Sequence, residues 1–357
     1  MKLIFLIIDL IILLFFKKKS HTDLIAIVKI DNIGDYVIWS DFIHSVACKT
    51  KNFILISNST YGELVPTSIK RMDLNQKLFK NNIYYRFTVL REIRNLGIHT
   101  IIQPVSHRGF VAGDSIVRVS GASSKITLNS NRKFIKRILD SFTYNKLLSY
   151  RMDSHQYNIS RAMFYQLYNK ELSNSLPLNS SNKQINYSRY CIFAIGASES
   201  YRKWCNAKWS ELALALTEKG YVDRILLVGG PNEINDGNLI SSRNKKVINL
   251  CGQTDLPMLT NFIKNSQFII GNESAAIHIA ASINKISFCI LGGGHFGEFM
   301  PYPNFSERNS YYIHEYMECF NCNWNCSLAK EKKYHCITSI KVRDVLKLIS
   351  EKFPIQT

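Results

Sequence analysis

Short apolar runs alternate with helical patterns along this chain, and the alternation occurs twice. In the first half, the runs at 24–30, 53–56 and 99–105 are separated by helical stretches. The predicted strands of the second half are 191–195, 224–228, 247–250, 267–270 and 286–291. Runs this short and apolar are typical of strands buried on both faces, and intervening helices make βαβ units with parallel sheets. The sequence therefore predicts an α/β fold with two Rossmann-like domains.

A Ser/Asn-rich stretch with a proline, ELSNSLPLNSSNKQINY, separates the two halves and is typical of a linker. In open parallel sheets, ligands bind at the carboxyl ends of the strands, so we expect a site in a cleft between the domains. The predicted parts are a membrane-associating segment (1–20), an N-terminal domain (21–175), a linker (176–187), a C-terminal domain (188–337) and a C-terminal helical segment (338–357).

Composition excludes several classes of protein. A chain of 357 residues with 46% hydrophobic and 20% charged residues is neither disordered nor collagen-like. Only one apolar run approaches spanning length, which excludes a protein with many membrane spans. The 45 basic and 27 acidic residues give a net charge of +18. This excess favours an anionic partner: nucleic acid, an acidic membrane or a phosphorylated substrate.

The apolar run begins near the N-terminus, from Leu3 to Phe16, and three lysines follow it directly. As a helix it would be about 21 Å long, short of the roughly 30 Å hydrocarbon core. Its charges lie mainly after the run and Asp9 interrupts it, so it does not resemble a secretory signal. We predict a shallow or monotopic membrane anchor with Lys17–Lys19 near anionic headgroups. The alternative is a buried first helix of the fold.

The I-G-D triplet ending in Asp35 lies where the first strand meets the first helix of the first half. A carboxylate there lies at the carboxyl edge of the sheet and can act as a general base. Alternatively, Asp35 caps the helix and Gly34 eases the turn.

Two loops of the second half have residues suited to phosphate. In the loop after 191–195, Gly196 allows close backbone approach and Lys203 supplies a point charge, although a lone lysine is usually solvated. After the strand at 267–270, Ser274 opens a helix whose first amides are unpaired and are covered only by small residues, which favours anion binding. One turn into that helix, His278 either faces the ligand or is a core histidine.

Residues 292–297 match G-x-G-x-x-G, the pattern of a dinucleotide-binding turn. That turn must open a helix, but Pro301 and Pro303 follow too closely, so we expect a glycine loop rather than an oxidoreductase site. No D-x-D triplet occurs in the sequence, which argues against a nucleotide held through a carboxylate-bound metal.

Four of the nine cysteines cluster as C-x2-C-x3-C-x9-C, and the other five are scattered. Thiolates at these spacings can form a tetrahedral zinc site, and a disulfide or plain thiols are the alternatives. With four cysteine ligands a zinc ion would be structural, because no position stays open for catalysis. The candidate ligands are Cys319, Cys322, Cys326 and Cys336.

The stretch 132–170 is helical in pattern and rich in Arg, Lys and aromatic residues. It either binds a phosphorylated or lipid-linked acceptor or presents solvated helix faces. Nucleic acid is the least favoured partner, because no recognisable motif is present and the basic residues are spread over both halves.

Several ordered segments resemble glycosyltransferase family nine, the heptosyltransferase-type enzymes of lipopolysaccharide assembly. They are IAIVKIDNIGDYVIWSDFI, LLVGGPNE, LCGQTDLPMLTNFIKNSQFIIGNESAAIHIAA and the cysteine-containing tail. The resemblance covers nearly the whole chain after the N-terminal run. It implies the GT-B fold, with acceptor bound mainly by the first domain, nucleotide sugar mainly by the second, and a C-terminal helix (about 338–352) packed back on the first.

The resemblance also implies roles for individual residues. Asp35 matches the family's catalytic aspartate, which would deprotonate the acceptor hydroxyl for an inverting transfer that needs no metal cofactor. Lys203 matches the phosphate-binding lysine, and Glu233 is a weaker match for the acidic residue at the donor ribose. Glu273 and Ala275 replace the usual Asp and Gly of the nucleotide loop. The donor-binding candidates are Gly34, Lys203, Glu233, Glu273, Ser274, Ala275 and His278.

These matches imply a glycosyltransferase that moves a heptose-like sugar from a nucleoside-diphosphate donor, with an ADP-sugar favoured, to a lipopolysaccharide or related glycan. The expected location is the cytoplasmic face of the bacterial inner membrane, with a lipid-linked or phosphorylated acceptor and no nucleic acid. The alternative function is a catalytically silent scaffold in a polysaccharide assembly complex.

Overall fold

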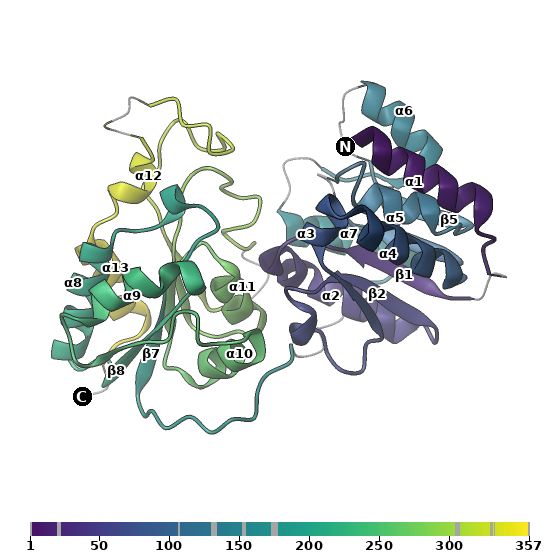
Figure 1. Ribbon diagram of the computed structural model, residues 1–357. Helices are drawn as coiled ribbons and strands as arrows, with labels where there is room; N and C mark the ends of the chain where they lie inside the picture. The colour runs from purple at the N-terminus through teal and green to yellow at the C-terminus, as the bar shows by residue number, and fades with distance from the viewer. Residues whose placement is uncertain are drawn as a thin grey trace. The chain divides into compact units, whose positions relative to one another are not determined.

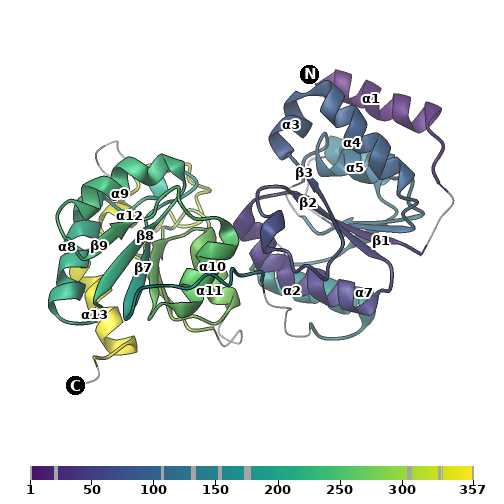
Figure 2. The same cartoon turned by 60° about the horizontal axis from the view of Figure 1, so that its bottom comes forward.

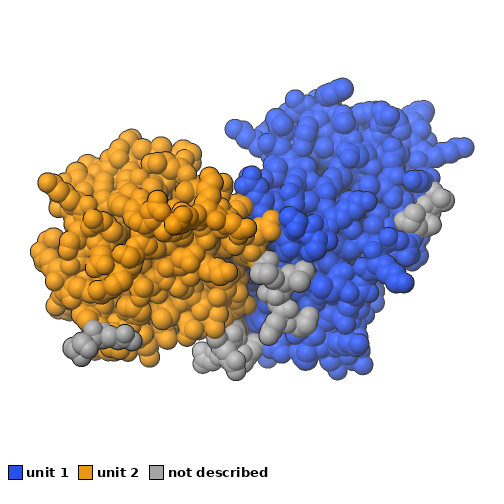
Figure 3. All heavy atoms as spheres, turned by 90° about the horizontal axis from the view of Figure 1, so that it is seen from below, with its two compact units in different colours: residues 1–177 blue, residues 178–357 orange. Residues whose placement is uncertain are grey.

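The computed structural model divides the chain into two compact units, unit 1 (1–177) and unit 2 (178–357) (Figure 3). The boundary falls inside the predicted linker. The described part of the linker belongs to unit 2, where the Ser181 amide donates to the Pro257 carbonyl oxygen. The structure describes residues 2–19, 23–105, 108–129, 134–151, 155–172, 178–303, 308–328, 331 and 333–355.

Unit 1 contains a six-stranded parallel sheet in the order β3-β2-β1-β4-β5-β6 (Figure 1). The chain forms β1, β2 and β3 in one direction and then crosses back to place β4 on the other side of β1. Central β1 (IAIVK) is β-branched and buried at four of its five residues, as a strand covered on both faces should be. The strands are β1 (Ile25–Lys29), β2 (Phe53–Asn58), β3 (Arg71–Leu74), β4 (Thr100–Gln103), β5 (Ser124–Leu128) and β6 (Lys146–Leu148).

Helices cover both faces of this sheet (Figure 2). Helices α2 and α7 pack together on one face, while α1, α4 and α5 contact one another on the other. The 310 turn η1 (Gly62–Leu64) follows β2. The helices are α1 (Lys2–Phe15), α2 (Ile33–Lys49), α3 (Gln76–Asn81), α4 (Ile83–Asn95), α5 (Gly113–Val119), α6 (Phe134–Thr143) and α7 (Gln156–Tyr168).

The N-terminal apolar run forms α1, and this helix is part of unit 1. Its side chains Phe5, Ile8 and Ile12 are buried in the hydrophobic core, so the alternative of a buried first helix describes this face. The other face is apolar and exposed, with Leu14 at 77% and Phe15 at 76%. No helix in the described ranges is long and apolar enough to cross a membrane. Membrane association of 1–20 therefore depends on the outer face and stays a prediction.

The basic stretch 132–170 is not helical throughout, because β6 lies between α6 and α7. One of its aromatic residues, Tyr144, is a core residue whose hydroxyl donates to the Asp114 carboxylate (2.7 Å). Arg132 and Lys133 lie outside the described residues. The proposed binding of an acceptor by this stretch stays a prediction.

Unit 2 repeats the topology of unit 1, with a parallel sheet in the order β12-β11-β10-β7-β8-β9. Counted from its first strand, each unit therefore has the Rossmann order 3-2-1-4-5-6, which confirms the predicted α/β architecture. The strands are β7 (Tyr190–Ala194), β8 (Arg224–Val228), β9 (Val247–Asn249), β10 (Ile269–Asn272), β11 (Ser287–Ile290) and β12 (Ser310–Ile313).

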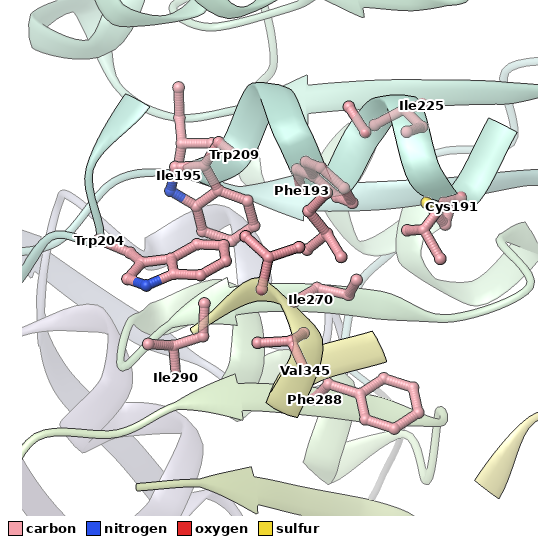
Figure 4. Close-up of a cluster of buried hydrophobic side chains, with 14 of the residues drawn as sticks. Cys191, Phe193, Ile195, Trp204, Trp209, Ile225, Ile270, Phe288, Ile290 and Val345 are labelled. Atoms are coloured by element: carbon pink, nitrogen blue, oxygen red, sulfur yellow. The ribbon is translucent and has the colours of Figure 1, made fainter. Parts of the chain in front are cut away.

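The core of unit 2 is rich in aromatic residues, and Figure 4 shows part of it. Trp204 and Trp209 are fully buried and meet edge to face, with ring centroids 5.1 Å apart. The indole N–H of Trp204 donates to the Ile340 carbonyl oxygen (3.0 Å). The helices are α8 (Asn206–Glu218), α9 (Ile234–Ser241), α10 (Leu256–Asn265), α11 (Ala275–Ser282), α12 (His335–Thr338) and α13 (Val342–Lys352), with 310 turns η2 (Ser200–Arg202) and η3 (Pro231–Glu233).

The C-terminal helix predicted at about 338–352 is α13. It packs against α8 and β12, and its side chains Val342, Val345 and Ile349 belong to the core of unit 2. The packing that the structure describes thus places this helix in the second domain. Its expected packing onto the first domain stays a prediction.

Candidate functional site

The carboxyl edge of the unit 2 sheet brings together three loops that the sequence separates widely. Strand β7 pairs with β8 on one side and with β10 on the other. Strands β8 and β9 extend the sheet on one side of β7, and β10, β11 and β12 then extend it on the other side. Ligands of open α/β sheets bind at such a switch point, beyond the carboxyl ends of the strands. The donor-site candidates of unit 2 lie in the loops after β7, β8 and β10, except Ala275 and His278, which lie in α11 (Ala275–Ser282) directly after the loop that follows β10.

Asn272, the last residue of β10, holds the loop after β7 in place through two hydrogen bonds. Its side-chain oxygen accepts from the Trp204 amide (3.0 Å), and its side-chain nitrogen donates to the Ile195 carbonyl oxygen (2.7 Å). Since Asn272 is completely buried, both bonds are shielded from water. No role was predicted for Asn272 from the sequence, although an amide side chain at the end of a buried strand was a usable signal.

Lys203 lies between two carboxylates. Its Nζ is 2.6 Å from Glu233 Oε1 and 3.5 Å from Asp236 Oδ2. Burial acts to lower the pKa of Lys203, but the hydrogen bond and charge of Glu233, together with Asp236, raise it above its ordinary value. Lys203 is therefore a charged and oriented lysine, not a solvated surface residue.

Glu233 is buried and is held from both sides. In addition to Lys203, it accepts a hydrogen bond from the Gly230 amide through Oε2 (2.8 Å). A Cβ at Gly229 would lie 2.8 Å from the Glu233 Cβ, and a Cβ at Gly196 would lie 3.2 Å from Oε2. The two glycines therefore leave the space that this carboxylate occupies.

A second ion pair joins the loops after β7 and β10. Arg202 Nη2 lies 2.7 Å from Glu273 Oε2, and both side chains are largely buried. The Arg202 guanidinium also lies over the Trp324 ring, 4.9 Å from its centroid. The sequence analysis named Lys203 but missed the adjacent Arg202. The neighbouring cation in SYRKW was the available signal.

Ser274 is the N-cap of α11, as predicted, and Ala275 is the first helical residue. The Ser274 carbonyl oxygen accepts from the amides of Ile277 and His278. Its hydroxyl is buried and has no hydrogen-bond partner within the described part of the chain. Because first-turn amides also lack partners inside a helix, the start of α11 can donate several hydrogen bonds to an anion.

His278 is buried within α11 and contacts an aromatic residue. Its Nδ1 lies 3.0 Å from the Tyr302 hydroxyl, and the two rings meet edge to face. Tyr302 is held in turn, because its amide donates to the Tyr312 hydroxyl (3.0 Å). This position fits the alternative of a core histidine; its predicted contact with the donor stays a prediction.

Asp35 and Gly34 belong to unit 1 and lie in the first turn of α2, directly after β1. The Asp35 Oδ2 accepts from the Asn32 backbone amide (3.3 Å), so the carboxylate does cap the helix, as in the alternative prediction. Asp35 is only half-buried, and β1 and β4 form the switch point of the unit 1 sheet. A carboxylate that caps a helix in this way can also accept a proton.

The four clustered cysteines line one cavity together with Trp324 and Tyr334. All four are free thiols, and Cys326 Sγ accepts from the Tyr334 amide (3.4 Å). Burial raises the pKa of Cys336, and the neighbouring cysteines add to the shift. Across the described ranges, no three Cys, His, Asp or Glu side chains are close enough to hold a metal ion. The arrangement therefore does not fit the predicted zinc site.

The glycine loop after β11 is packed against this cysteine segment. A Cβ at Gly293 would lie 2.1 Å from the Phe320 ring, and a Cβ at Gly294 would lie 2.3 Å from the Trp324 ring. The Gly293 carbonyl oxygen accepts from the Asn321 amide (2.7 Å). Because these glycines have no side chain, the rings of Phe320 and Trp324 can pack directly against the loop backbone.

Comparisons with known proteins identify a family and a fold. Residues 116–326 match the family described as glycosyltransferase family 9 (heptosyltransferase). The chain is 23% identical over 333 residues to lipooligosaccharide heptosyltransferase 2 of Campylobacter jejuni, covering 89% of this chain and 96% of the relative.

Two solved structures show the same fold. The glycosyltransferase family 9 protein of Veillonella parvula has a TM-score of 0.74 at 15% identity, covering 94% of this chain and 98% of its own. Heptosyltransferase WaaC of Escherichia coli, solved with ADP-2-deoxy-2-fluoro heptose, has a TM-score of 0.66 at 13% identity, covering 92% and 99%. The likeness extends over both units and identifies the fold as GT-B.

Proposed function

Because the chain belongs to glycosyltransferase family 9 and has the GT-B fold, we propose that it transfers a heptose-like sugar from ADP to a lipopolysaccharide or related glycan. That it is a glycosyltransferase follows from the family. Donor, acceptor, catalytic base and inversion are the proposal. The observation that carries it is the joining of three strand-end loops in unit 2 through the pairs Lys203–Glu233 and Arg202–Glu273.

In this proposal unit 2 binds the donor diphosphate. Lys203 supplies a positive charge, and the first amides of α11 and the Ser274 hydroxyl donate hydrogen bonds. These donors are already oriented, so they stabilise the negative charge that develops on ADP as the sugar leaves. Glu233 accepts from a ribose hydroxyl, as the family match suggests. The relative solved with an ADP-heptose analogue supports ADP as the nucleotide.

Asp35 of unit 1 acts as the general base. Its carboxylate takes the proton of the acceptor hydroxyl as that oxygen attacks the anomeric carbon. The bond between the sugar and the diphosphate breaks on the opposite side, ADP leaves with the bonding electrons, and the configuration inverts. No step needs a metal ion.

The acceptor is a lipid-linked or phosphorylated glycan at the cytoplasmic face of the inner membrane. The net charge of +18 supports an anionic acceptor and an anionic surface. Nucleic acid is not part of the proposal.

The test compares two aspartates at opposite ends of β1. Asp35 follows the strand, whereas the exposed Asp23 precedes it. We expect Asp35→Asn to lower transfer from ADP-heptose by about a hundredfold or more. ADP binding, measured by calorimetry, should stay unchanged in that variant. Asp23→Asn should match the wild type in both measurements.

Two outcomes would contradict the proposal at different points. Full transfer by Asp35→Asn would remove Asp35 as the base and leave the donor site intact. Absence of ADP binding by the folded wild-type protein would remove the donor assignment itself.

A further inference from the structure

Helix α1 has two apolar faces, and only one of them is covered by unit 1. The buried face contributes Phe5, Ile8 and Ile12 to the core. The opposite face repeats at intervals of three and four residues, so it forms one continuous stripe along the helix. This outer stripe consists of Ile4, Ile7, Leu10, Ile11, Leu14 and Phe15, all of them exposed.

The helix is fixed to unit 1 by a buried cluster of charges. Asp9 is 2% exposed, and its carboxylate lies 3.3 Å from Arg86 Nη2 and 2.7 Å from Arg118 Nη2. The Ser115 hydroxyl donates to the same carboxylate. Pulling α1 out of unit 1 would leave two arginines without their buried counter-ion, which is strongly unfavourable. The outer stripe is therefore presented by a helix that stays in place.

Positive charge follows the stripe directly. Lys17, Lys18 and Lys19 are all exposed, immediately after α1. The turn before them is held in place, because Arg94 donates to the Phe16 carbonyl oxygen (3.0 Å). An apolar stripe flanked by lysines matches the boundary of an anionic bilayer, where acyl chains lie beneath negative headgroups.

Helix α6 of unit 1 also presents apolar side chains to solvent. Helix α5 contacts both α1 and α6. On α6, the Phe142 side chain is 79% exposed and Ile138 is half-exposed. Two helices that share one support thus both present apolar side chains to solvent, which is more than scattered surface residues provide.

We propose that α1 docks unit 1 onto an anionic bilayer by lying flat in its surface, with the outer stripe among the acyl chains and Lys17–Lys19 at the headgroups. The helix does not cross the bilayer, because it is too short and Asp9 holds its other face to unit 1. A second copy of the chain fits the stripe less well, because α1 offers the three lysines no exposed carboxylate: its one acidic residue, Asp9, is buried. The inference deepens the proposed membrane location and rests on it for its biological meaning.

Vesicle flotation of the full chain tests the docking independently of sugar transfer. We expect binding to vesicles containing phosphatidylglycerol and little binding to pure phosphatidylcholine. Exchanging the three lysines for glutamine should lower the partition coefficient about a hundredfold. The double substitution Leu14→Glu and Phe15→Glu should lower it at least tenfold. The matched control is Leu239→Glu on α9 of unit 2, a similarly exposed leucine, which should bind as the wild type does.

Each variant is also checked for ADP binding and for mass in solution. Unchanged ADP binding shows that the protein is folded and that any loss of flotation belongs to α1, whereas loss of ADP binding by the wild type would concern the proposed function alone. Wild-type flotation that survives the double substitution would overturn the proposal. A double variant that dissociates a dimer but still floats would assign the stripe to a second copy instead.

Discussion

The two units share one strand order but use their ion pairs differently. In unit 1, Asp9, Arg86 and Arg118 form a cluster buried between helices α1, α4 and α5. In unit 2, Lys203–Glu233 and Arg202–Glu273 lie at the carboxyl ends of the strands and keep some exposure. The same sheet is thus built once with charges that join helices and once with charges that surround a candidate ligand site.

This difference shows that the position of a charged pair matters more than its presence. Burial lowers the pKa of Arg86, and Asp9 opposes that shift, so each charge of the unit 1 cluster depends on its partner. A ligand cannot reach such a cluster. At the strand ends of unit 2, by contrast, an incoming diphosphate can take the place of a carboxylate beside Lys203. Four predictions test this contrast.

The largest expected effect is on the stability of unit 1. Asp9→Ala leaves Arg86 and Arg118 buried without their carboxylate, which should lower the free energy of unfolding by about 3–5 kcal/mol. Urea unfolding followed by circular dichroism measures the change. The control is Asp223→Ala, which removes an exposed carboxylate 3.9 Å from Arg189 and should cost less than about 1 kcal/mol. Equal losses in the two variants would contradict a structural role for Asp9.

The second prediction concerns ligand binding in unit 2. Lys203→Ala should weaken ADP binding about ten- to a hundredfold, as expected for a hydrogen bond to a charged group, and should lower the unfolding midpoint less than Asp9→Ala does. Isothermal titration calorimetry gives the dissociation constant. Lys219→Ala, at the exposed end of α8, is the matched control. A large loss of stability with unchanged ADP affinity would place Lys203 with the structural pairs of unit 1.

A smaller effect should come from Arg202→Lys, which keeps the charge beside Glu273 but removes the planar group over Trp324. We expect ADP affinity to fall about two- to fivefold, in line with the strength of a cation–π contact. Fluorescence of Trp324 provides a second measurement, because its environment changes directly. If Arg202→Lys binds ADP like the wild type, the stacking on Trp324 has no part in the donor site.

The smallest effect is on the pH dependence of stability. Burial opposes the charged form of Lys203, but Glu233 and Asp236 raise its pKa above the ordinary 10.5. A raised folded pKa gives a stabilisation that is complete below the unfolded pKa and is lost as pH rises through the folded one. The difference in unfolding midpoint between wild type and Lys203→Ala should therefore be constant from about pH 6 to 9 and shrink only in strong alkali. A difference that fades below pH 9 would contradict the raised pKa.

The sequence predicted the strands that are apolar runs and missed those that are partly exposed. Strands β1, β7 and β10 are apolar runs buried on both faces, so their pattern is plain. The sequence missed four strands, β3, β5, β6 and β12, of which all but β5 lie at a sheet edge. All four are partly exposed (RMDL, SKITL, KLL and SYYI), so none of them forms a continuous apolar run. The hydrophobic pattern of a segment indicates how buried its strand is, and the missed strands are less buried than β1, β7 and β10.

The candidate site was predicted residue by residue but not pair by pair. The strand-end rule predicted loops that ion pairs join at one edge of the unit 2 sheet, yet nothing local links Lys203 to Glu233, which is 30 positions further on. The same reason explains α1. Hydropathy indicated an anchor interrupted by Asp9, because the partners Arg86 and Arg118 lie 77 and 109 positions away. Only the fold brings such charges together.

Because Arg202 and Lys203 are each paired with a carboxylate, the candidate donor site of unit 2 has no unpaired positive charge at these two residues. A bare cluster of positive charge inside a cell would collect inorganic phosphate, ATP and stretches of RNA without discrimination. Here an incoming anion must first compete with Glu233 for Lys203 or with Glu273 for Arg202. Inorganic phosphate gives the displaced glutamate no replacement partner, whereas a nucleotide can donate a hydrogen bond from a ribose hydroxyl to Glu233. Selectivity for a nucleotide would then arise from the free energy needed to displace a glutamate from its cation. Glu233 and Glu273 would discriminate between anions in addition to joining the loops.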